Sequence, residues 1–157
     1  MNKADEQFLR RAIQLSIENQ DKDGGPFGAL IVKDGEIIAS AGNTVTKVND
    51  PTAHAEINAI REACRELQDF ELNGCVLYSS CEPCPMCLGA IYWARLDRVC
   101  FAATRYDAKD AGFDDSSIYR EIQLPYDKRT IPTEQSLRSE AVVAFEHWRN
   151  KEDKIEY

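Results

Sequence analysis

The sequence predicts a three-layer α/β/α sandwich with a mixed central sheet. Two apolar, strand-like segments flank Asp34-Gly35, a pair that is typical of a tight hairpin turn between antiparallel strands. Two further strand-like segments are each preceded by a helical pattern, and strands separated by helices imply parallel crossovers. A hairpin joined to parallel crossovers gives a mixed sheet that is covered by helices on both faces.

The first part of the chain contains one predicted helix and the hairpin. Apolar residues recur at close to helical period from about residue 4 to residue 19. Gly24-Gly25-Pro26 ends this pattern, because glycine and proline together favour a turn. Residues 29–32 form the first predicted strand, and residues 36–40 form its antiparallel partner.

The middle of the chain predicts two helices, each followed by a strand. Thr52 is the expected N-cap of a helix over residues 53–67, and residues 75–78 form the next strand. Proline suits the first turn of a helix, so the second helix is expected from near Pro83 to about residue 95. Residues 98–102 follow as the fourth strand.

The last part of the chain is less regular. Residues 112–116, Gly-Phe-Asp-Asp-Ser, are typical of a loop, and a short helix is expected to follow them. Apolar residues from Leu137 to Arg149 indicate a final amphipathic helix. No internal repeat occurs, and residues 1–157 are expected to form a single domain, for which the length is ordinary.

The charge and the start of the chain limit the expected partners. A formal net charge of −8 and a pI near 4.8 argue against nucleic acid, whose binding usually needs a cluster of Lys and Arg. A small neutral molecule is easier to reconcile with this charge. No apolar run is long enough for a membrane span, and the first residues lack the order of a secretory signal, so the cytoplasm is the expected location.

The cysteine pattern indicates metal binding. Six cysteines are present, and three of them lie between residues 81 and 87, which is ligand spacing rather than the spacing of disulfide-closed loops. Disulfides are also disfavoured in a reducing compartment. The six are Cys64, Cys75, Cys81, Cys84, Cys87 and Cys100.

Two motifs together predict a catalytic zinc site. His54-Ala55-Glu56 precedes a proline-flanked Cys84-x-x-Cys87, and zinc prefers nitrogen and sulfur ligands in a tetrahedron whose fourth position stays open in enzymes. The two cysteines lie at a predicted helix start, so both thiolates share one face and the helix dipole favours their charged form. We expect one Zn²⁺ on His54, Cys84 and Cys87, with Glu56 beside the open position.

The sequence leaves other interpretations of these residues open. A lone histidine such as His54 is often a packed or exposed residue, and the three clustered cysteines also resemble part of an iron–sulfur run, which usually needs a fourth cysteine. A structural zinc would need another Cys or His at the ion. Cys81 is expected to be structural, Cys64, Cys75 and Cys100 to be packing residues, and His147 to be a surface or packing residue.

The chain resembles the cytidine deaminase-like superfamily and, within it, the short bacterial guanine deaminases. The histidine-x-glutamate motif and the proline-flanked Cys-x-x-Cys motif are the signature of zinc-dependent nucleobase deaminases. The subfamily resemblance rests on Ala111-Gly112-Phe113-Asp114-Asp115 and on the terminal Glu156-Tyr157. It implies a cytidine deaminase-like fold and the hydrolysis of guanine to xanthine and ammonia, in purine catabolism or salvage.

The resemblance also implies roles for individual residues. Glu56 would carry protons between the attacking water, the ring nitrogen and the leaving amine. Asp115, or alternatively Asp114, would accept hydrogen bonds from guanine and shuttle a proton, although both acids could instead cap the helix that follows. The other residues expected to bind the base are Asn43, Phe27, Ala55, Trp93 and Tyr157. From sequence alone, Asn43 could equally be a turn residue, and the two aromatic residues could belong to the core.

A homodimer is the assembly that the resemblance implies. In it, residues 137–157 form a C-terminal helix and tail that exchange between subunits, so that Tyr157 closes the partner's site. The rival functions are deamination of cytosine or another small base and deamination of adenosine in tRNA, against which the acidic charge weighs. A structural zinc-binding module is the non-enzymatic alternative. Neither a membrane nor a nucleic acid is an expected partner.

Overall fold

A computed structural model describes residues 1–157 and contains the predicted mixed sheet. The four strands are β1 (Gly25–Lys33), β2 (Glu36–Asn43), β3 (Cys75–Cys81) and β4 (Arg98–Ala103). Their order across the sheet is β2-β1-β3-β4, with β1 antiparallel to β2 and β3, and β3 parallel to β4. The predicted combination of one hairpin and a parallel crossover is therefore confirmed.

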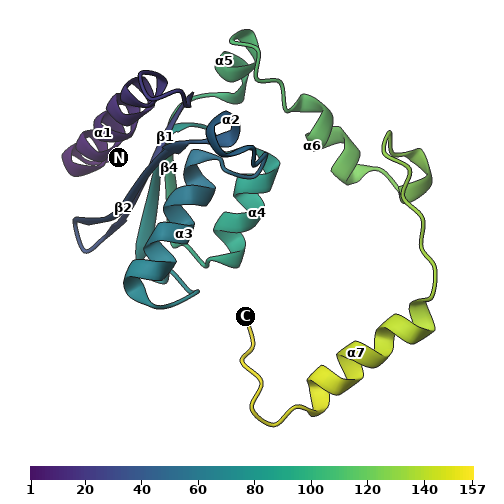
Figure 1. Ribbon diagram of the computed structural model, residues 1–157. Coiled ribbons are helices and arrows are strands. Elements are labelled where there is room, and N and C mark those ends of the chain that lie inside the picture. The colour runs from purple at the N-terminus through teal and green to yellow at the C-terminus, as the bar shows by residue number, and fades with distance from the viewer. The chain divides into compact units, whose positions relative to one another are not determined.

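Helices cover both faces of the sheet. The helix α1 packs on one face, and α3 and α4 pack on the other (Figure 1). The helices are α1 (Lys3–Gln20), α2 (Val45–Val48), α3 (Ala55–Leu67), α4 (Pro85–Trp93), α5 (Arg105–Asp110), α6 (Ser116–Gln123) and α7 (Arg138–Asn150), with a 3₁₀ turn at Tyr126–Lys128.

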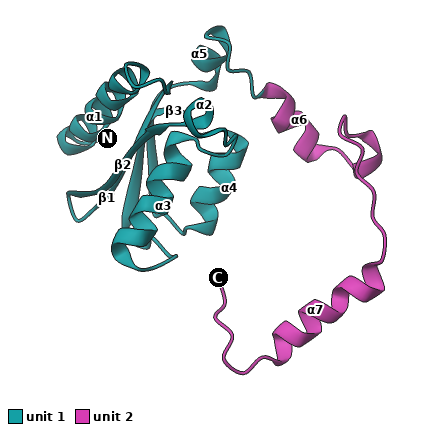
Figure 2. Cartoon of the chain, in the orientation of Figure 1, with its two compact units in different colours: residues 1–115 teal, residues 116–157 magenta.

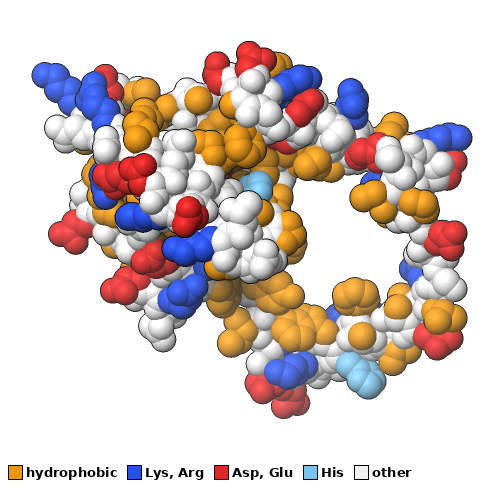
Figure 3. Space-filling model, turned by 45° about the horizontal axis from the view of Figure 1, so that its top comes forward, with side chains coloured by type: hydrophobic (Ala, Val, Ile, Leu, Met, Phe, Trp, Pro, Cys, Tyr) orange, Lys and Arg blue, Asp and Glu red, His pale blue; other side chains and the backbone are white.

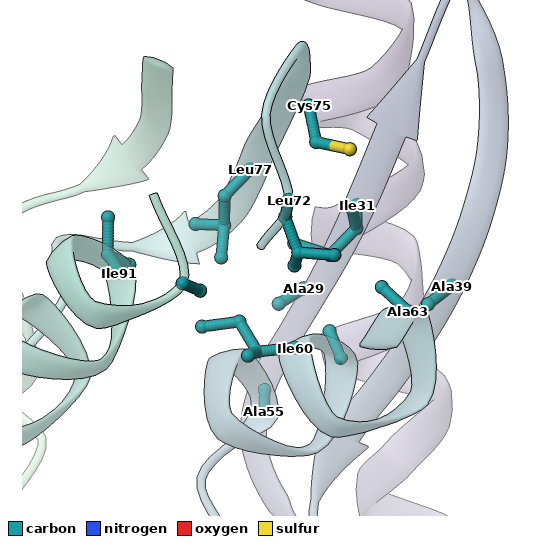
Figure 4. Packing of buried hydrophobic residues seen from close by; sticks show 12 residues of the cluster. Ala29, Ile31, Ala39, Ala55, Ile60, Ala63, Leu72, Cys75, Leu77 and Ile91 are labelled. Carbon is teal, nitrogen blue, oxygen red and sulfur yellow. The ribbon is translucent and has the colours of Figure 1, made fainter. Parts of the chain in front are cut away.

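The alternation of side chains along β1 explains the two-sided core. Ala29 and Ile31 point to the face that carries α3 and α4, whereas Leu30 and Val32 point to the face that carries α1. All four side chains are buried, so this central strand reads as one continuous apolar run. Figure 4 shows the larger of the two clusters, in which Ile60 and Leu77 pack toward the same centre.

The hairpin turn has the predicted form, but its strands are longer than expected. Asp34 and Gly35 both have positive φ, at 51° and 82°, as a two-residue hairpin turn with the twist of the strands requires. The strand β1 already starts at Gly25, although Gly24-Gly25-Pro26 predicted a turn. A register shift between Gly25 and Gly28 accommodates Pro26 there, because proline cannot donate to a regular ladder.

Two helix starts differ from the sequence prediction. Thr52 is not an N-cap: its N–H and hydroxyl groups both bond to Asp50 Oδ1, at 2.8 and 2.7 Å, and α3 begins only at Ala55. The helix α4 begins at Pro85 rather than near Pro83, because a residue before proline disfavours helical backbone angles and Cys84 is accordingly extended. The short helix α5 was not predicted; it begins with a capping box formed by Thr104 and Asp107.

An ion pair between the buried Asp5 and the exposed Arg98 joins the start of α1 to the sheet. Asp5 is 3% exposed and accepts hydrogen bonds from Arg98 Nη2 and from the hydroxyl group of Tyr78, both at 2.6 Å. These bonds, that of Arg98 first, hold the pKa of Asp5 well below its usual range, and burial together with Asp5 raises the pKa of Tyr78 to about 12. The cluster joins α1, β3 and β4 at one point.

The chain divides into two compact units, residues 1–115 and residues 116–157 (Figure 2). The first unit contains the whole sheet with α1 to α5. No residue of the second unit is buried, so that unit has no core of its own. Figure 3 shows many hydrophobic side chains at the molecular surface. The single domain over residues 1–157 stays a prediction.

No helix in the structure has both the length and the apolar character that a membrane crossing needs.

Candidate metal centre

The starts of two helices bring three potential metal ligands together. His54 Nδ1 lies 3.6 Å from Cys84 Sγ and 3.5 Å from Cys87 Sγ. The ligand atoms of these three residues all lie within 4.8 Å of one another. Cys87 is fully buried, and His54 and Cys84 are half-buried.

His54 and Cys84 both occupy helix N-cap positions, where side chains usually bond to the first turn of the helix. His54 is the N-cap of α3 and Cys84 is the N-cap of α4, and neither side chain makes a capping hydrogen bond. N-cap positions favour Ser, Thr, Asp and Asn, whose oxygen atoms bond to the first turn. Here the side chains turn toward each other instead, and the positive ends of two helix dipoles face the same point, which favours anionic ligands.

The geometry fits a zinc ion. Tetrahedral zinc with ordinary bond lengths places a nitrogen ligand about 3.5 Å and a second sulfur about 3.8 Å from a sulfur ligand. The two N–S distances of 3.6 and 3.5 Å match that requirement. Soft sulfur with imidazole nitrogen is also the donor set that zinc prefers. His54, Cys84 and Cys87 could therefore hold zinc through Nδ1 and two Sγ atoms, which leaves a fourth position.

The electrostatics of the group favour a cation. The hydrogen bond from Cys87, and after it the His54 ring, lower the pKa of Cys84 to about 4, against the opposing effect of burial. The pKa of Cys87 is raised, by its bond to Cys84 and by burial. The Cys84 bond also raises the pKa of His54. The lowered pKa favours the thiolate form of Cys84, and a dication would also stabilise a thiolate on Cys87.

Glu56 lies on the first turn of α3, two residues after His54, and is 6% exposed. The hydroxyl group of Ser79, on β3, lies 3.4 Å from Glu56 Oε1 and donates to it. Burial raises the pKa of Glu56 above its usual range. A buried carboxyl group with a raised pKa can both take and give a proton near neutral pH.

No fourth Cys or His completes the group. The structure contains one group of three or more potential metal ligands, and that group consists of His54, Cys84 and Cys87. Cys81 Sγ instead contacts the backbone oxygen of Thr104 at 3.6 Å, in agreement with a structural role. The other cysteines lie elsewhere, and the second histidine, His147, lies on α7 in the second unit. A closed structural zinc site is therefore disfavoured.

The two neighbouring acids, Asp114 and Asp115, differ in their surroundings. Asp114 is exposed and pairs with Lys109 Nζ at 3.1 Å. Asp115 is half-buried, and its pKa is raised, first by burial and then by the negative charge of Cys84. The charge of Cys84 thus acts on the carboxyl group of Asp115.

Asn43 is the last residue of β2 and is 9% exposed. Its side-chain oxygen accepts the backbone N–H of Val45 at 3.1 Å. The next residue, Thr44, donates its backbone N–H to the oxygen of Ala53 at 3.0 Å, directly before His54. Asn43 therefore ends its strand beside the loop that carries the histidine.

Phe27 contacts the loop that carries the two acids. Its ring meets Phe113 edge-on, with 4.9 Å between centroids and 84° between planes. Both rings line a cavity of about 420 Å³ that also includes Cys81. His54, Cys84 and Cys87 are not among the residues that line this cavity.

Three residues expected at the site have other surroundings. The side chain of Ala55 is fully buried in the core, which leaves only its backbone for a ligand contact. Trp93 is at the far end of the nine-residue α4, about 12 Å along the helix axis from Pro85. Tyr157 belongs to the second unit.

Two polar residues that support the site belong to no sequence motif. Ser79 lies directly after the strand predicted over residues 75–78, and Asn58 lies within the helix predicted over residues 53–67. Asn58 Nδ2 donates to Gly42 O at 3.0 Å, to Thr44 Oγ1 at 3.1 Å and, more weakly, to Ala53 O at 3.3 Å. A polar residue next to the apolar positions of the predicted helix was the only available signal for Asn58.

Comparison with known proteins adds a consistent set of relatives. A family model described as the cytidine and deoxycytidylate deaminase zinc-binding region matches residues 2–103. Guanine deaminase of Bacillus subtilis is 57% identical over 153 residues, which cover 97% of this chain and 98% of that protein. The X-ray structure of guanine deaminase from Bacillus subtilis superposes with a TM-score of 0.95 at 56% identity, and covers 100% of this chain and 99% of that one. A tRNA-specific adenosine deaminase of Aquifex aeolicus is 47% identical over 107 residues, 68% of this chain and 70% of that protein.

Proposed function

Because the chain belongs to the family of zinc-binding cytidine and deoxycytidylate deaminases, we propose that it hydrolyses guanine to xanthine and ammonia. Membership also accounts for the predicted cytidine deaminase-like sandwich, which the superposition on a solved guanine deaminase confirms. The observation that carries the proposal is the group of His54, Cys84 and Cys87 with the buried Glu56 beside it.

His54, Cys84 and Cys87 would hold one zinc ion per chain. Zinc bound there would lower the pKa of a bound water molecule toward neutrality. The carboxylate of Glu56 would accept the proton of the attacking water and pass it to a ring nitrogen and then to the leaving amine. Water and guanine together then account for all atoms of xanthine and ammonia. The bond from Ser79 would orient the Glu56 carboxylate during these transfers.

Guanine presents N–H donors next to a carbonyl group, which two side chains of this site complement. A half-buried Asp115 carboxylate would accept from those donors, and an unmatched carboxylate would penalise a base that lacks them. Asp115 would also relay a proton during turnover. The side-chain oxygen of Asn43 is already bonded to Val45, so its NH₂ group would be the part that meets an acceptor on the base.

Four further contacts are proposed with the base. Phe27 would stack on the ring, held by its edge-on contact with Phe113. The backbone N–H of Ala55, at the first position of α3, would bond to an acceptor of the base. Trp93 would contribute a further aromatic contact, and Tyr157 would contribute one through a second subunit.

We further infer a homodimer in which residues 137–157 exchange between subunits. The second unit supports this inference because none of its residues is buried while Phe145 and Ile155 are 66% and 67% exposed. A segment with no buried side chain needs an apolar surface to dock on, and exchange of an identical element is a low-cost route to a dimer. Tyr157 would then close the site of the partner.

The expected setting is the cytoplasm, with no membrane or nucleic acid as partner. The net charge of −8 supports a small neutral substrate over tRNA. The level of identity supports guanine, since guanine deaminase of Bacillus subtilis is 57% identical over 97% of the chain and the Aquifex aeolicus tRNA deaminase is 47% identical over 68%.

A substrate panel tests the proposal. Ammonia release is measured from guanine, adenine, cytosine, their nucleosides and tRNA at equal enzyme concentration. Release from guanine at a rate far above all others is the expected result. Release from cytosine or tRNA alone would assign the site to a rival deaminase, and release from none would favour a structural zinc module.

A further inference from the structure

Asn19 is a buried polar residue at the end of α1, where that helix meets two strand ends. Its side chain is 9% exposed, and its Nδ2 donates to the backbone oxygen of Gly25 and to the backbone oxygen of Asn43, both at 2.8 Å. Gly25 begins β1, and Asn43 ends β2, where the two residues pair. One amide group thus holds both strand ends through its two hydrogens.

Two glycines leave the space that this amide fills. A Cβ at Gly42 would lie 2.1 Å from Asn19 Oδ1, and its three nearest atoms would all belong to the Asn19 side chain. A Cβ at Gly24 would lie 2.2 Å from Asn19 Nδ2. Gly42 does not have a positive φ, so close approach rather than backbone conformation is what favours glycine there.

Asn43, whose side-chain amide is proposed to bind the base, is the last residue of β2. Asn43 Oδ1 is fixed by the N–H of Val45, and a Cβ at Gly25 would lie 3.1 Å from that oxygen. The backbone of Asn43 therefore determines where its side-chain amide lies. The backbone oxygen of Asn43 in turn accepts a hydrogen bond from the Asn19 side chain. Asn19 belongs to α1, which packs on the face of the sheet opposite to α3.

We propose that Asn19 is a positioning residue for the substrate-binding amide of Asn43. The inference rests on the proposed function, in which Asn43 reads the base. Without the Asn19 amide, the backbone oxygens of Gly25 and Asn43 would each lose a hydrogen bond. The start of β1 and the end of β2 would then no longer be held by α1. The amide of Asn43 would then no longer be held where the base requires it, although Asn19 itself touches neither the base nor the metal ligands.

The first test replaces Asn19 and follows the kinetics with guanine. In Asn19→Ala, KM for guanine is expected to rise about tenfold, as loss of ordinary hydrogen bonds predicts, while kcat changes less than about threefold. Ser16→Ala is the matched control. Ser16 lies on the same face of α1 at 8% exposure, and its hydroxyl group bonds within the helix to Ile13 O at 2.7 Å. The KM of the Ser16→Ala enzyme for guanine is expected to stay within about twofold of the wild-type value.

A double-mutant cycle distinguishes positioning from a general structural effect. If Asn19 acts through Asn43, then Asn19→Ala raises KM in the wild-type background but adds almost nothing in an Asn43→Ala background. If Asn19 only stabilises the fold, the two changes in KM multiply. Multiplying effects would overturn the inference.

Gly42→Ala reaches the same amide by steric displacement and serves where Asn19→Ala yields little folded protein. It is expected to raise KM for guanine, because its methyl group occupies the place of Asn19 Oδ1. In an Asn19→Ala background the methyl group has room, so the double variant should be no worse than Asn19→Ala alone. A Gly42→Ala enzyme with wild-type KM would also overturn the inference. A wild-type protein inactive on guanine would instead contradict the proposed function.

Discussion

His54 and Cys84 are both N-cap residues, and their side chains lie 3.6 Å apart between two converging helix starts. This relationship explains how a short stretch of sequence can build a metal site. The helices α3 and α4 fix the backbone of each residue, and the intervening strand β3 sets their separation. The ligands are thus preorganised by rigid elements, as tight metal binding requires.

Removal of a cysteine ligand should release the metal. In Cys84→Ser and Cys87→Ser, zinc content measured by elemental analysis should fall well below one ion per chain, and guanine turnover should be lost. Cys81→Ser is the control, because Cys81 bonds to the oxygen of Thr104 and not to the group. Zinc loss in Cys81→Ser, with full retention in Cys84→Ser, would contradict the ligand assignment.

Asp115 and Asp114 should differ in their effect on substrate binding. In the proposed function the Asp115 carboxylate accepts from donors of the base, so Asp115→Asn should lower kcat/KM for guanine by about 100-fold. Asp114→Asn breaks an exposed ion pair with Lys109, and kcat/KM should stay within severalfold. Steady-state kinetics with guanine measure both. Equal losses in the two variants would remove the distinction between these acids.

The tail should affect activity without affecting the metal. A chain that ends at residue 150 retains every residue of the metal group but lacks Tyr157. Its zinc content should equal that of the full chain, while kcat/KM for guanine falls at least about tenfold, through loss of a closing aromatic contact. Light scattering after size exclusion should show a dimer for the full chain. An equally active truncated chain would argue against closure by the tail.

The Asp5–Arg98 pair should make the free energy of unfolding depend on pH in the acidic range. The folded-state pKa of Asp5 is depressed, so its contribution is present above the unfolded pKa of about 4 and is lost as pH falls toward the folded pKa. Asp5→Asn should lower the urea midpoint at pH 7, and the difference from the wild type should shrink below about pH 4. Glu6→Gln is the control, because Glu6 forms an exposed pair with Arg10. A difference that stays constant down to pH 3 would contradict this assignment.

The metal group and the fold class could be predicted from the sequence for physical reasons. Zinc chemistry restricts its ligands to few residue types, and His54, Cys84 and Cys87 lie in local motifs whose spacing is visible. The alternating and helical apolar patterns similarly indicate the sheet and the helices that cover it.

The supporting contacts could not be predicted, because they depend on the tertiary arrangement. Asn19 reaches the backbone of Asn43, and Asn58 reaches that of Gly42, across gaps in sequence that carry no pattern. Threonine is a common N-cap, so the sequence predicts that role for Thr52, whereas in the structure Asp50 binds its hydroxyl group in a turn. The helix α5 is six residues long, too short for a periodic signal.

Glu56 is the residue on which the proposed chemistry depends most directly. The decisive measurement compares Glu56→Gln with the wild type for xanthine formation from guanine and for zinc content in the same preparations. Glutamine keeps the shape and the bond from Ser79 but cannot take up a proton, so zinc should stay near one ion per chain while kcat falls at least about 100-fold. A fully zinc-loaded Glu56→Gln enzyme that converts guanine at the wild-type rate would contradict the proposed proton transfer by Glu56.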